Sequence, residues 1–236
     1  MDIIKFLEEG GKQYLPNLSI DHVIIGYEDS KLKCLLLRIT DKWVLPGGYI
    51  QFSESVEHAA VRILKERTGL ENPHQKFLSV FGETNRKFKN QWKAQFLNAG
   101  IPWKEDYWIN NRFVTLAYYS LVDMKVTAPV AGEYHDEIAW FDFADLPEMW
   151  MDHKSIAMEA RNRLKDDIKR EHIVYNLLPK QFTMPDLHQL HQDILEQEVE
   201  RSRFQKKMLG TGIFERLPKL QKETPGRNPY LYQIKE

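Results

Sequence analysis

The chain has 236 residues and a formal net charge of −1, and 42% of its residues are hydrophobic. This length allows two domains, and the apolar fraction is sufficient for a packed core. No apolar run approaches the roughly 18 residues of a membrane-spanning helix, the early acidic residues are not typical of a secretory signal, and the single cysteine, Cys34, excludes a disulfide framework. We therefore expect a cytoplasmic protein that does not contact a membrane.

The charge is distributed unevenly along the chain. Residues 199–235 contain nine Lys and Arg against three Glu, a balance of +6, whereas residues 1–198 carry a balance of −6. This asymmetry predicts an acidic domain, residues 1–171, followed by a basic domain, residues 172–236.

The first domain is expected to be built around a sheet. It starts with a short helix and a linker that ends at Pro16. Runs of β-branched and other apolar residues between turn signals then predict strands. We expect these strands at residues 20–27, 31–40, 76–84, 113–122 and from residue 137. Apolar residues at helical spacing predict a helix over 155–171.

The stretch from 43 to 70, WVLPGGYIQFSESVEHAAVRILKERTGL, predicts a strand, a glycine turn, a loop and a helix. Ser55 is the expected N-cap, and Gly69 stands where a residue that ends a helix belongs. The spacing of residues 48–70 also resembles the Nudix box, G-x5-E-x7-R-E-U-x-E-E-x-G-U, in which U is apolar. The matching residues are Gly48, Glu54, Arg62, Leu64, Glu66, Gly69 and Leu70. With the order of the strands, this resemblance implies an α/β fold, the Nudix α/β/α sandwich.

The sequence departs from the motif where the motif serves catalysis. In Nudix hydrolases three glutamates on one helix face hold divalent cations against a diphosphate, and Mg²⁺ prefers such oxygen ligands. The residues here are Ile63, Glu66 and Arg67, so the charge of this face is zero instead of −3. We therefore expect a degenerate box with no catalytic residue, no metal and no cofactor. The vestigial Glu54 and Glu66 are expected to form structural salt bridges, the latter with Arg62 one helical turn away.

Residues 85–111 interrupt the simple pattern of strands. They contain six aromatic residues between lysines and asparagines, and a structureless loop of this length is uncommon in a compact domain. We expect a helical insert with aromatic anchors. Such an insert could close over a pocket, pack at a dimer interface or fold as a surface insertion on its own aromatic residues.

Several residues are expected near the open edge of the sheet, where a ligand could bind. A carboxylate such as that of Asp21, which opens a central strand, needs partners if it is buried. Hydrogen bonds to loop amides would satisfy it, and so would a ligand, because polar groups that converge in a mostly apolar cleft suit a small polyol. The candidate effector contacts are Asp21, Gly48, Glu83, Arg112 and Tyr118.

The second domain is predicted to be a winged helix-turn-helix. Thr183 is the expected N-cap of its first helix, and a second helix is expected over 199–210. The inward residues of the second helix are expected to be Val199, Phe204, Met208 and Leu209. The runs GIFERLP and PYLYQIK are expected to pair as a hairpin, and the second helix of such a motif enters the major groove. The candidate DNA contacts are Arg201, Ser202, Arg203, Lys206, Lys207 and Arg227.

The two halves together resemble the Nudix-related transcriptional regulators, in which a Nudix domain precedes a winged helix-turn-helix. The segment RILKERTGL looks like the degenerate box of the sugar-responsive branch typified by the arabinose regulator AraR. The resemblance implies a homodimer that binds an inverted-repeat operator in double-stranded DNA and senses a small-molecule effector, a pentose such as arabinose or xylose rather than ADP-ribose. Two other functions remain open: an active Nudix pyrophosphohydrolase acting on a nucleoside diphosphate derivative, and a protein-interaction module with a basic tail.

Overall fold

The computed structural model describes residues 3–39, 41–71, 73–130, 137–221 and 228–235. Its main feature is a mixed seven-stranded sheet of order β3-β2-β1-β6-β5, with β4 paired to β1 and β7 paired to β2. The strands are β1 (Tyr14–Glu28), β2 (Lys31–Ile39), β3 (Lys42–Val44), β4 (Gly47–Gln51), β5 (His74–Phe81), β6 (Val114–Leu121) and β7 (Glu137–Asp142). β1 and β6 run parallel, and the other pairs are antiparallel.

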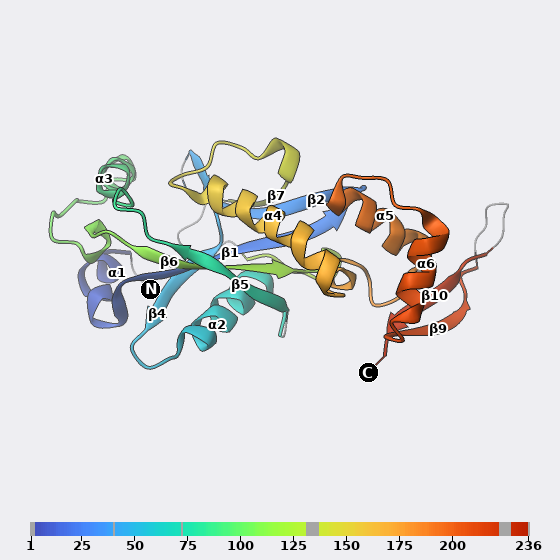
Figure 1. The fold of residues 1–236 in the computed structure, drawn as a ribbon. Coiled ribbons are helices and arrows are strands. Elements are labelled where there is room, and N and C mark those ends of the chain that lie inside the picture. The colour runs from blue at the N-terminus through green and yellow to red at the C-terminus, as the bar shows by residue number, and fades with distance from the viewer. Residues whose placement is uncertain (1–2, 40, 72, 131–136, 222–227, 236) are drawn as a thin grey trace.

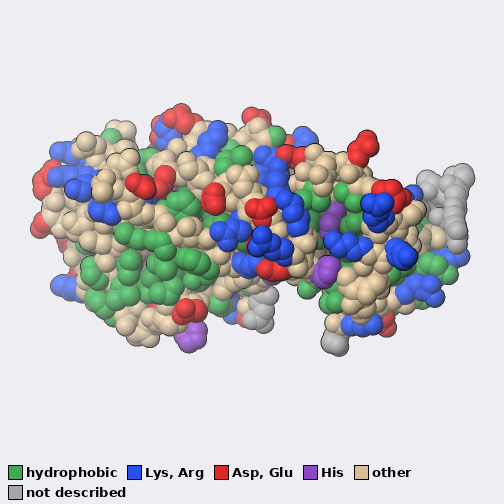
Figure 2. All heavy atoms as spheres, in the orientation of Figure 1, with side chains coloured by type: hydrophobic (Ala, Val, Ile, Leu, Met, Phe, Trp, Pro, Cys, Tyr) green, Lys and Arg blue, Asp and Glu red, His purple; other side chains and the backbone are tan. Residues whose placement is uncertain are grey.

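Helices cover the sheet on both faces. α2 (Val56–Thr68) lies on one face and α4 (His153–Arg170) on the other (Figure 1). The predicted α/β/α sandwich is therefore confirmed. Exposed Phe77 and Val80 belong to β5 at the edge of the sheet, and Figure 2 shows hydrophobic side chains gathered over this part of the molecule. No helix in the described part combines the length and the apolar character needed to cross a bilayer.

The predicted caps of α2 are present. The Ser55 hydroxyl accepts a hydrogen bond from the His58 amide, and Gly69 ends the helix at φ 70°, in the left-handed region that glycine adopts without a Cβ penalty. Ala59, Ala60 and Ile63 are buried on the side that faces the sheet. The apolar spacing along residues 56–64 therefore predicted the buried face correctly.

The N-terminal segment contains the predicted short helix but not the predicted linker. α1 (Ile3–Glu9) and the short η1 (Gly10–Lys12) are followed at once by β1, which contains Pro16. Proline lacks the amide donor that a regular ladder uses, and the register of β1 against β4 shifts between Tyr14 and Ser19. Asn17 takes a positive φ of 62° at this irregularity. Pro16 thus marks a bulge within a longer strand instead of the end of a linker.

The insert at 85–111 contains α3 (Lys89–Asn98) and η2 (Trp108–Asn110). Phe96, Tyr107 and Ile109 are buried in one cluster with Leu7 of α1. The rings of Trp92 and Trp150 lie 4.7 Å apart and connect the insert to the segment before α4. The helical character and the aromatic anchoring of the insert match the prediction.

The C-terminal part has the architecture of a winged helix. After η3 (Phe143–Asp145), α4 and η4 (Val174–Leu177), it contains α5 (Met184–Leu195), α6 (Arg201–Gly210), and the strands β9 (Phe214–Lys219) and β10 (Tyr230–Ile234). Thr183 caps α5 in a reciprocal capping box with Asp186, as its sequence position predicted. β8 (Phe182–Thr183) adds an unpredicted third strand beside β10. Leu209, expected to face inward, is 42% exposed because the buried face of α6 is formed by Phe204 and Met208.

The hydrophobic core continues across the predicted domain boundary at residues 171 and 172. Leu164 and Ile168 of α4 belong to the same buried cluster as Leu190 of α5 and Phe204 of α6. The hydroxyl of Tyr27 also donates a hydrogen bond to Asp193 of α5. The boundary itself stays a prediction, but the two parts are packed against each other.

Candidate functional site

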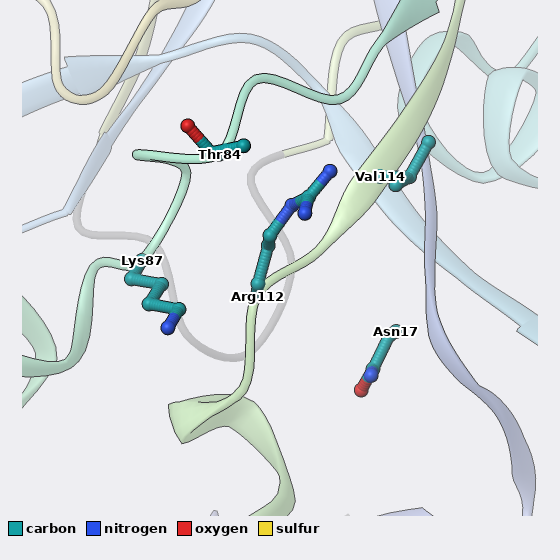
Figure 3. Close-up of a pocket in the computed structure, with 5 residues that line it drawn as sticks. All are labelled: Asn17, Thr84, Lys87, Arg112 and Val114. Carbon is teal, nitrogen blue, oxygen red and sulfur yellow. The ribbon is translucent and has the colours of Figure 1, made fainter.

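A cavity of about 620 Å³ opens at the edge of the sheet where β1 and β6 begin and β5 ends. Its lining residues are Asn17, Thr84, Lys87, Arg112 and Val114. Figure 3 shows Arg112 between Thr84 and Lys87 on one side and Asn17 and Val114 on the other. The parallel pairing of Leu18 with Val114 places the two strand starts side by side. The loop after β5 supplies the remaining wall.

The charge of this cavity is positive. Lys87 and Arg112 each contribute a cation, and no Asp or Glu stands among the described lining residues. The Nη2 group of Arg112 donates to the Gly82 carbonyl, and its Nε is buried without a hydrogen-bond partner in the described structure. Arginine and lysine at one site favour an anionic ligand, above all phosphate, whose oxygens match the guanidinium fork.

An aromatic cluster adjoins the cavity through Phe113, which lies between Arg112 and Val114 in the chain. The ring of Phe113 is 5.6 Å from the rings of Tyr49 and Trp108. Trp108 in turn stacks on Tyr14 at 5.8 Å. The rings therefore come from β1, β4 and the insert. None of these rings is among the described lining residues of the cavity, so the cluster is a neighbour of the cavity along the chain only.

Of the predicted effector contacts, Arg112 lines the cavity. Glu83 is exposed in the loop that carries Thr84, next to the lining but not part of it. Gly48 pairs with Ile20, and a Cβ at this position would stand 3.0 Å from the Ile63 side chain. Its role in the structure is therefore the close approach of β4 to α2.

The structure does not bring Tyr118 or Asp21 into the lining. Tyr118 is buried against α2, with its ring 5.7 Å from His22 and 5.5 Å from Phe77. The carboxylate of Asp21 is buried 3.9 Å from a guanidinium nitrogen of Arg86 and 3.9 Å from Nε2 of His153. Its neighbours in the structure are therefore the side chains of Arg86 and His153, and a contact between Asp21 and a ligand stays a prediction.

Arg86 is a central residue that no pattern in the sequence singles out. Its Nε and Nη2 donate to both oxygens of Asp152 at 2.7 and 3.1 Å. Its Nη1 donates to the carbonyls of Phe81 and Phe113. The side chain is only 4% exposed, and a buried guanidinium is stable only when it is paired in this way. An isolated Asn-Arg-Lys run contains no signal for a partner 66 residues away.

The box helix holds its two remaining glutamates in ion pairs. Arg62 binds Glu54 at 2.6 Å and Glu66 at 3.2 Å and also donates to the Tyr49 carbonyl. The hydrogen bonds from Arg62 lower the pKa of Glu54 below its usual value. Both predicted salt bridges are present. The carboxylates are thereby bound to a fixed cation on the protein.

The two substituted box positions have different surroundings. Ile63 is 1% exposed and packs with Ile20 and Ile50 between α2 and the sheet. Arg67 donates weakly to the Gly47 carbonyl at 3.4 Å, and burial lowers the pKa of its guanidinium. Among the residues that the structure describes, no group of three or more His, Cys, Asp or Glu side chains could hold a metal ion.

The candidate nucleic-acid interface is α6. Its N-cap, Glu200, accepts hydrogen bonds from the amides of Ser202 and Arg203, which supports the first turn. The predicted contacts on this helix are all exposed: Arg201, Ser202, Arg203, Lys206 and Lys207. On the wing, Arg216 and Lys219 lie over the ring of Tyr230 at 4.6 and 5.3 Å. The sixth predicted contact, Arg227, lies outside the described residues.

Comparison with known proteins gives a consistent picture. Residues 19–160 match the family model of the NUDIX domain, and residues 174–234 match that of the NrtR DNA-binding winged helix domain. The chain is 22% identical over 222 residues to the ADPR responsive transcriptional repressor NtrR of Acinetobacter baylyi, with 91% of this chain and 80% of the relative covered.

The chain is also similar to an enzyme and to a protein of known structure in complex with DNA. The chain is 25% identical over 146 residues to an ADP-ribose pyrophosphatase of Methanocaldococcus jannaschii, which covers 60% of this chain and 70% of the relative. Its fold is similar to the crystal structure of Shewanella oneidensis NrtR complexed with a 27mer DNA, with a TM-score of 0.74 and 24% identity. That alignment covers 92% of this chain and 93% of the other.

Proposed function

The chain belongs to the NUDIX domain family and ends in a winged helix of the NrtR DNA-binding type, and from this premise we propose that it is a transcriptional regulator whose affinity for double-stranded DNA changes when ADP-ribose binds its NUDIX domain. The observation that carries the proposal is the cavity lined by Lys87 and Arg112 in the same chain as the exposed basic face of α6.

The chemistry of ADP-ribose fits this cavity. Its diphosphate carries two negative charges, which two cations can balance with charge-assisted hydrogen bonds. Lys87 and Arg112 both line the cavity, so a phosphate oxygen bound there would meet two cationic side chains. The adenine or ribose part would then lie toward Phe113, Tyr49 and Trp108. Tight binding of a diphosphate does not require a metal when two protein cations supply the charge.

The same geometry favours sensing over hydrolysis. A Nudix hydrolase uses carboxylates to hold divalent cations, whereas this chain has Ile63 and Arg67 at two of the three positions. Arg62 holds Glu54 and Glu66 in ion pairs. A cation at position 67 would repel a metal at the place where the metal has to stabilise the leaving phosphate. We therefore infer that ADP-ribose is bound without being cleaved.

The effector is proposed to be ADP-ribose instead of the pentose expected from the sequence. The named relatives include an ADPR responsive repressor and an ADP-ribose pyrophosphatase, and neither name refers to a free pentose such as arabinose or xylose. A neutral pentose would also leave Lys87 and Arg112 without a counter-charge. Arabinose and xylose remain useful as comparison ligands because each is a pentose that differs from ribose at one stereocentre and lacks the diphosphate.

Calorimetric titration with ADP-ribose in the absence of metal tests the effector site. Replacing Arg112→Gln or Lys87→Gln is expected to weaken binding about tenfold each, which corresponds to roughly 1.4 kcal/mol for a lost charge-assisted hydrogen bond. The matched control is Lys65→Gln, which removes an exposed lysine paired with Glu71 at the end of α2. Equal affinity of all four proteins would show that this cavity is not the binding site.

A parallel incubation with Mg²⁺ tests the absence of turnover. ADP-ribose mixed with the protein is expected to remain intact over hours when it is followed by chromatography. Release of AMP and ribose 5-phosphate at a rate that depends on Mg²⁺ would favour the pyrophosphohydrolase. Binding of arabinose or xylose with no binding of ADP-ribose would restore the sugar effector.

A further inference from the structure

Helix α4 contacts the cavity wall at its N-terminal end. Asp152, the residue before α4, accepts two hydrogen bonds from Arg86 at 2.7 and 3.1 Å. Arg86 follows Thr84 by two residues and precedes Lys87, so it belongs to the loop that supplies both to the cavity. A displacement of this loop therefore pulls directly on the start of α4.

Arg86 also connects the other wall of the cavity to the same point. Its Nη1 donates to the carbonyls of Phe81 and Phe113 at 3.2 and 3.1 Å. Phe113 is the neighbour of Arg112, the cation that lines the opposite side. One buried guanidinium thus joins the end of β5, the start of β6 and α4. A ligand that draws the two walls together has to move this guanidinium or strain its hydrogen bonds.

Farther along the helix, α4 forms ion pairs with the DNA-binding domain. Arg161 and Lys165, one helical turn apart, bind the two carboxylate oxygens of Glu196, the Lys165 pair at 2.5 Å. Glu196 is the C-cap of α5 and has a φ of 53°. The left-handed region is unfavourable for a residue with a side chain. The two ion pairs therefore help to stabilise the backbone conformation of Glu196 at the end of α5. α6 begins five residues later, at Arg201.

The last turn of α4 is attached to the sheet. Asp167 accepts a hydrogen bond from the hydroxyl of Tyr119 at 2.5 Å and forms an ion pair with Lys76 at 3.1 Å. The helix is 18 residues long, about 27 Å at 1.5 Å per residue. Because its last turn is fixed to the sheet, a shift of its N-terminal end displaces the residues in between, which include Arg161 and Lys165.

We infer that α4 transmits the state of the cavity to the recognition helix α6, through Arg86 and Asp152 at its N-terminal end and through Arg161, Lys165 and Glu196 farther along the helix. The inference rests on the proposed function for the identity of the effector. A ligand acts through this link because it binds one position of the loop better than the other, and the same difference in free energy then biases the position of α6.

The first test removes the ion pairs of Glu196 with Arg161 and Lys165 and leaves the lining of the cavity unchanged. In Glu196→Gln, ADP-ribose is expected to bind within twofold of its wild-type affinity, while its effect on DNA affinity falls below twofold. The matched control is Asp166→Asn, which removes an exposed ion pair with Lys169 on the same helix but no contact with α5. The control is expected to respond to ADP-ribose as the wild type does. A full wild-type response in Glu196→Gln would overturn the inference.

The second test needs no ligand and separates this inference from the proposed function. DNA affinity is measured for Asp152→Asn, Glu196→Gln and the double variant, with melting curves to establish that each is folded. Distant, independent sites give effects that multiply, whereas the link predicts a double variant that departs at least threefold from the product of the single effects. Effects that multiply to within twofold would overturn the link.

Pairing Asp152→Asn with Glu71→Gln provides the control cycle, because Glu71 is an exposed residue that forms an ion pair with Lys65 at the end of α2. These two effects are expected to multiply. If the wild type fails to bind ADP-ribose, the proposed effector is wrong, and the cycle between Asp152 and Glu196 still decides the role of α4.

Discussion

At the scale of single residues, position 63 of α2 shows that a substitution in the Nudix box has a structural role in this protein. Ile63 is 1% exposed, and its side chain packs against Gly48. A Cβ atom at Gly48 would stand 3.0 Å from the Ile63 side chain. A glutamate at position 63 would have to bury its carboxylate among Ile20, Ile50 and Ala60. The isoleucine is therefore part of the core of this protein.

We predict that Ile63→Glu lowers the free energy of unfolding by about 3 kcal/mol, because an unpaired carboxyl group replaces a buried apolar side chain. The matched control is Val61→Glu on the same helix, where the side chain is 40% exposed and a change within about 0.5 kcal/mol is expected. Urea denaturation measures both. Equal stability of the two variants would mean that position 63 can reach solvent.

A second residue-scale prediction concerns His191. It is 8% exposed, its Nδ1 lies 2.8 Å from the Leu187 carbonyl oxygen, and burial lowers its pKa to about 4. The unfolded chain binds a proton near pH 6.5 and the folded chain does not, so stability falls as the pH is lowered from about 6.5 to 4.

The expected contribution of His191 at pH 5 is a loss of roughly 2 kcal/mol, from about 1.4 kcal/mol for each pH unit below 6.5. Thermal melting at pH 7 and pH 5 should therefore show a smaller pH dependence in His191→Gln than in the wild type. His58→Gln, at an exposed position on α2, serves as the control. An unchanged pH dependence in His191→Gln would contradict the assignment.

At the scale of elements, α6 separates a buried face from a basic one. Phe204 and Met208 anchor it on α5, and the side chains that carry charge are left outside. We predict that Lys206→Ala or Lys207→Ala weakens binding to all DNA sequences by a similar factor and lowers the slope of log affinity against log salt by about 1.

Fluorescence anisotropy on several duplexes at three salt concentrations measures this effect. Lys169→Ala, an exposed lysine on α4, should change neither the affinity nor the slope. If Lys206→Ala altered binding at one base position only, Lys206 would be a base contact and not a phosphate contact.

The elements with a local chemical signal were predicted from the sequence. Ser55 with Gly69 and Thr183 with Asp186 mark helix ends through hydrogen bonds between near neighbours, so a few residues of sequence contain the information. The ion pair of Arg62 with Glu66 follows from helical spacing. The exposed basic residues of α6 also follow from such a pattern.

Features that depend on distant partners were not predicted. Pro16 lies inside β1 because β4 and β6 flank the strand, and β8 exists because β10 returns to it from the end of the chain. Arg86 meets Asp152 across 66 residues. Lys87 was missed as a lining residue, because its position depends on the path of the loop after β5.

At the scale of the whole molecule, one chain carries one recognition helix, and a dimer would present two. We predict a homodimer of twice 28.0 kDa that binds an inverted repeat whose half-sites are separated by about one helical turn, 10–10.5 base pairs, or a multiple of it. Sedimentation velocity measures the mass, and selection from random duplexes reads the operator. A monomer that prefers a single half-site would contradict this prediction.

The central claim is that ADP-ribose changes DNA binding without being consumed. The most direct measurement is the anisotropy of a labelled duplex, selected by the protein from a random library, titrated with protein with and without ADP-ribose in the presence of Mg²⁺. The account predicts a change in Kd of at least tenfold, about 1.4 kcal/mol of coupling, while the nucleotide stays intact. An unchanged Kd together with release of AMP would contradict it and identify the protein as a hydrolase.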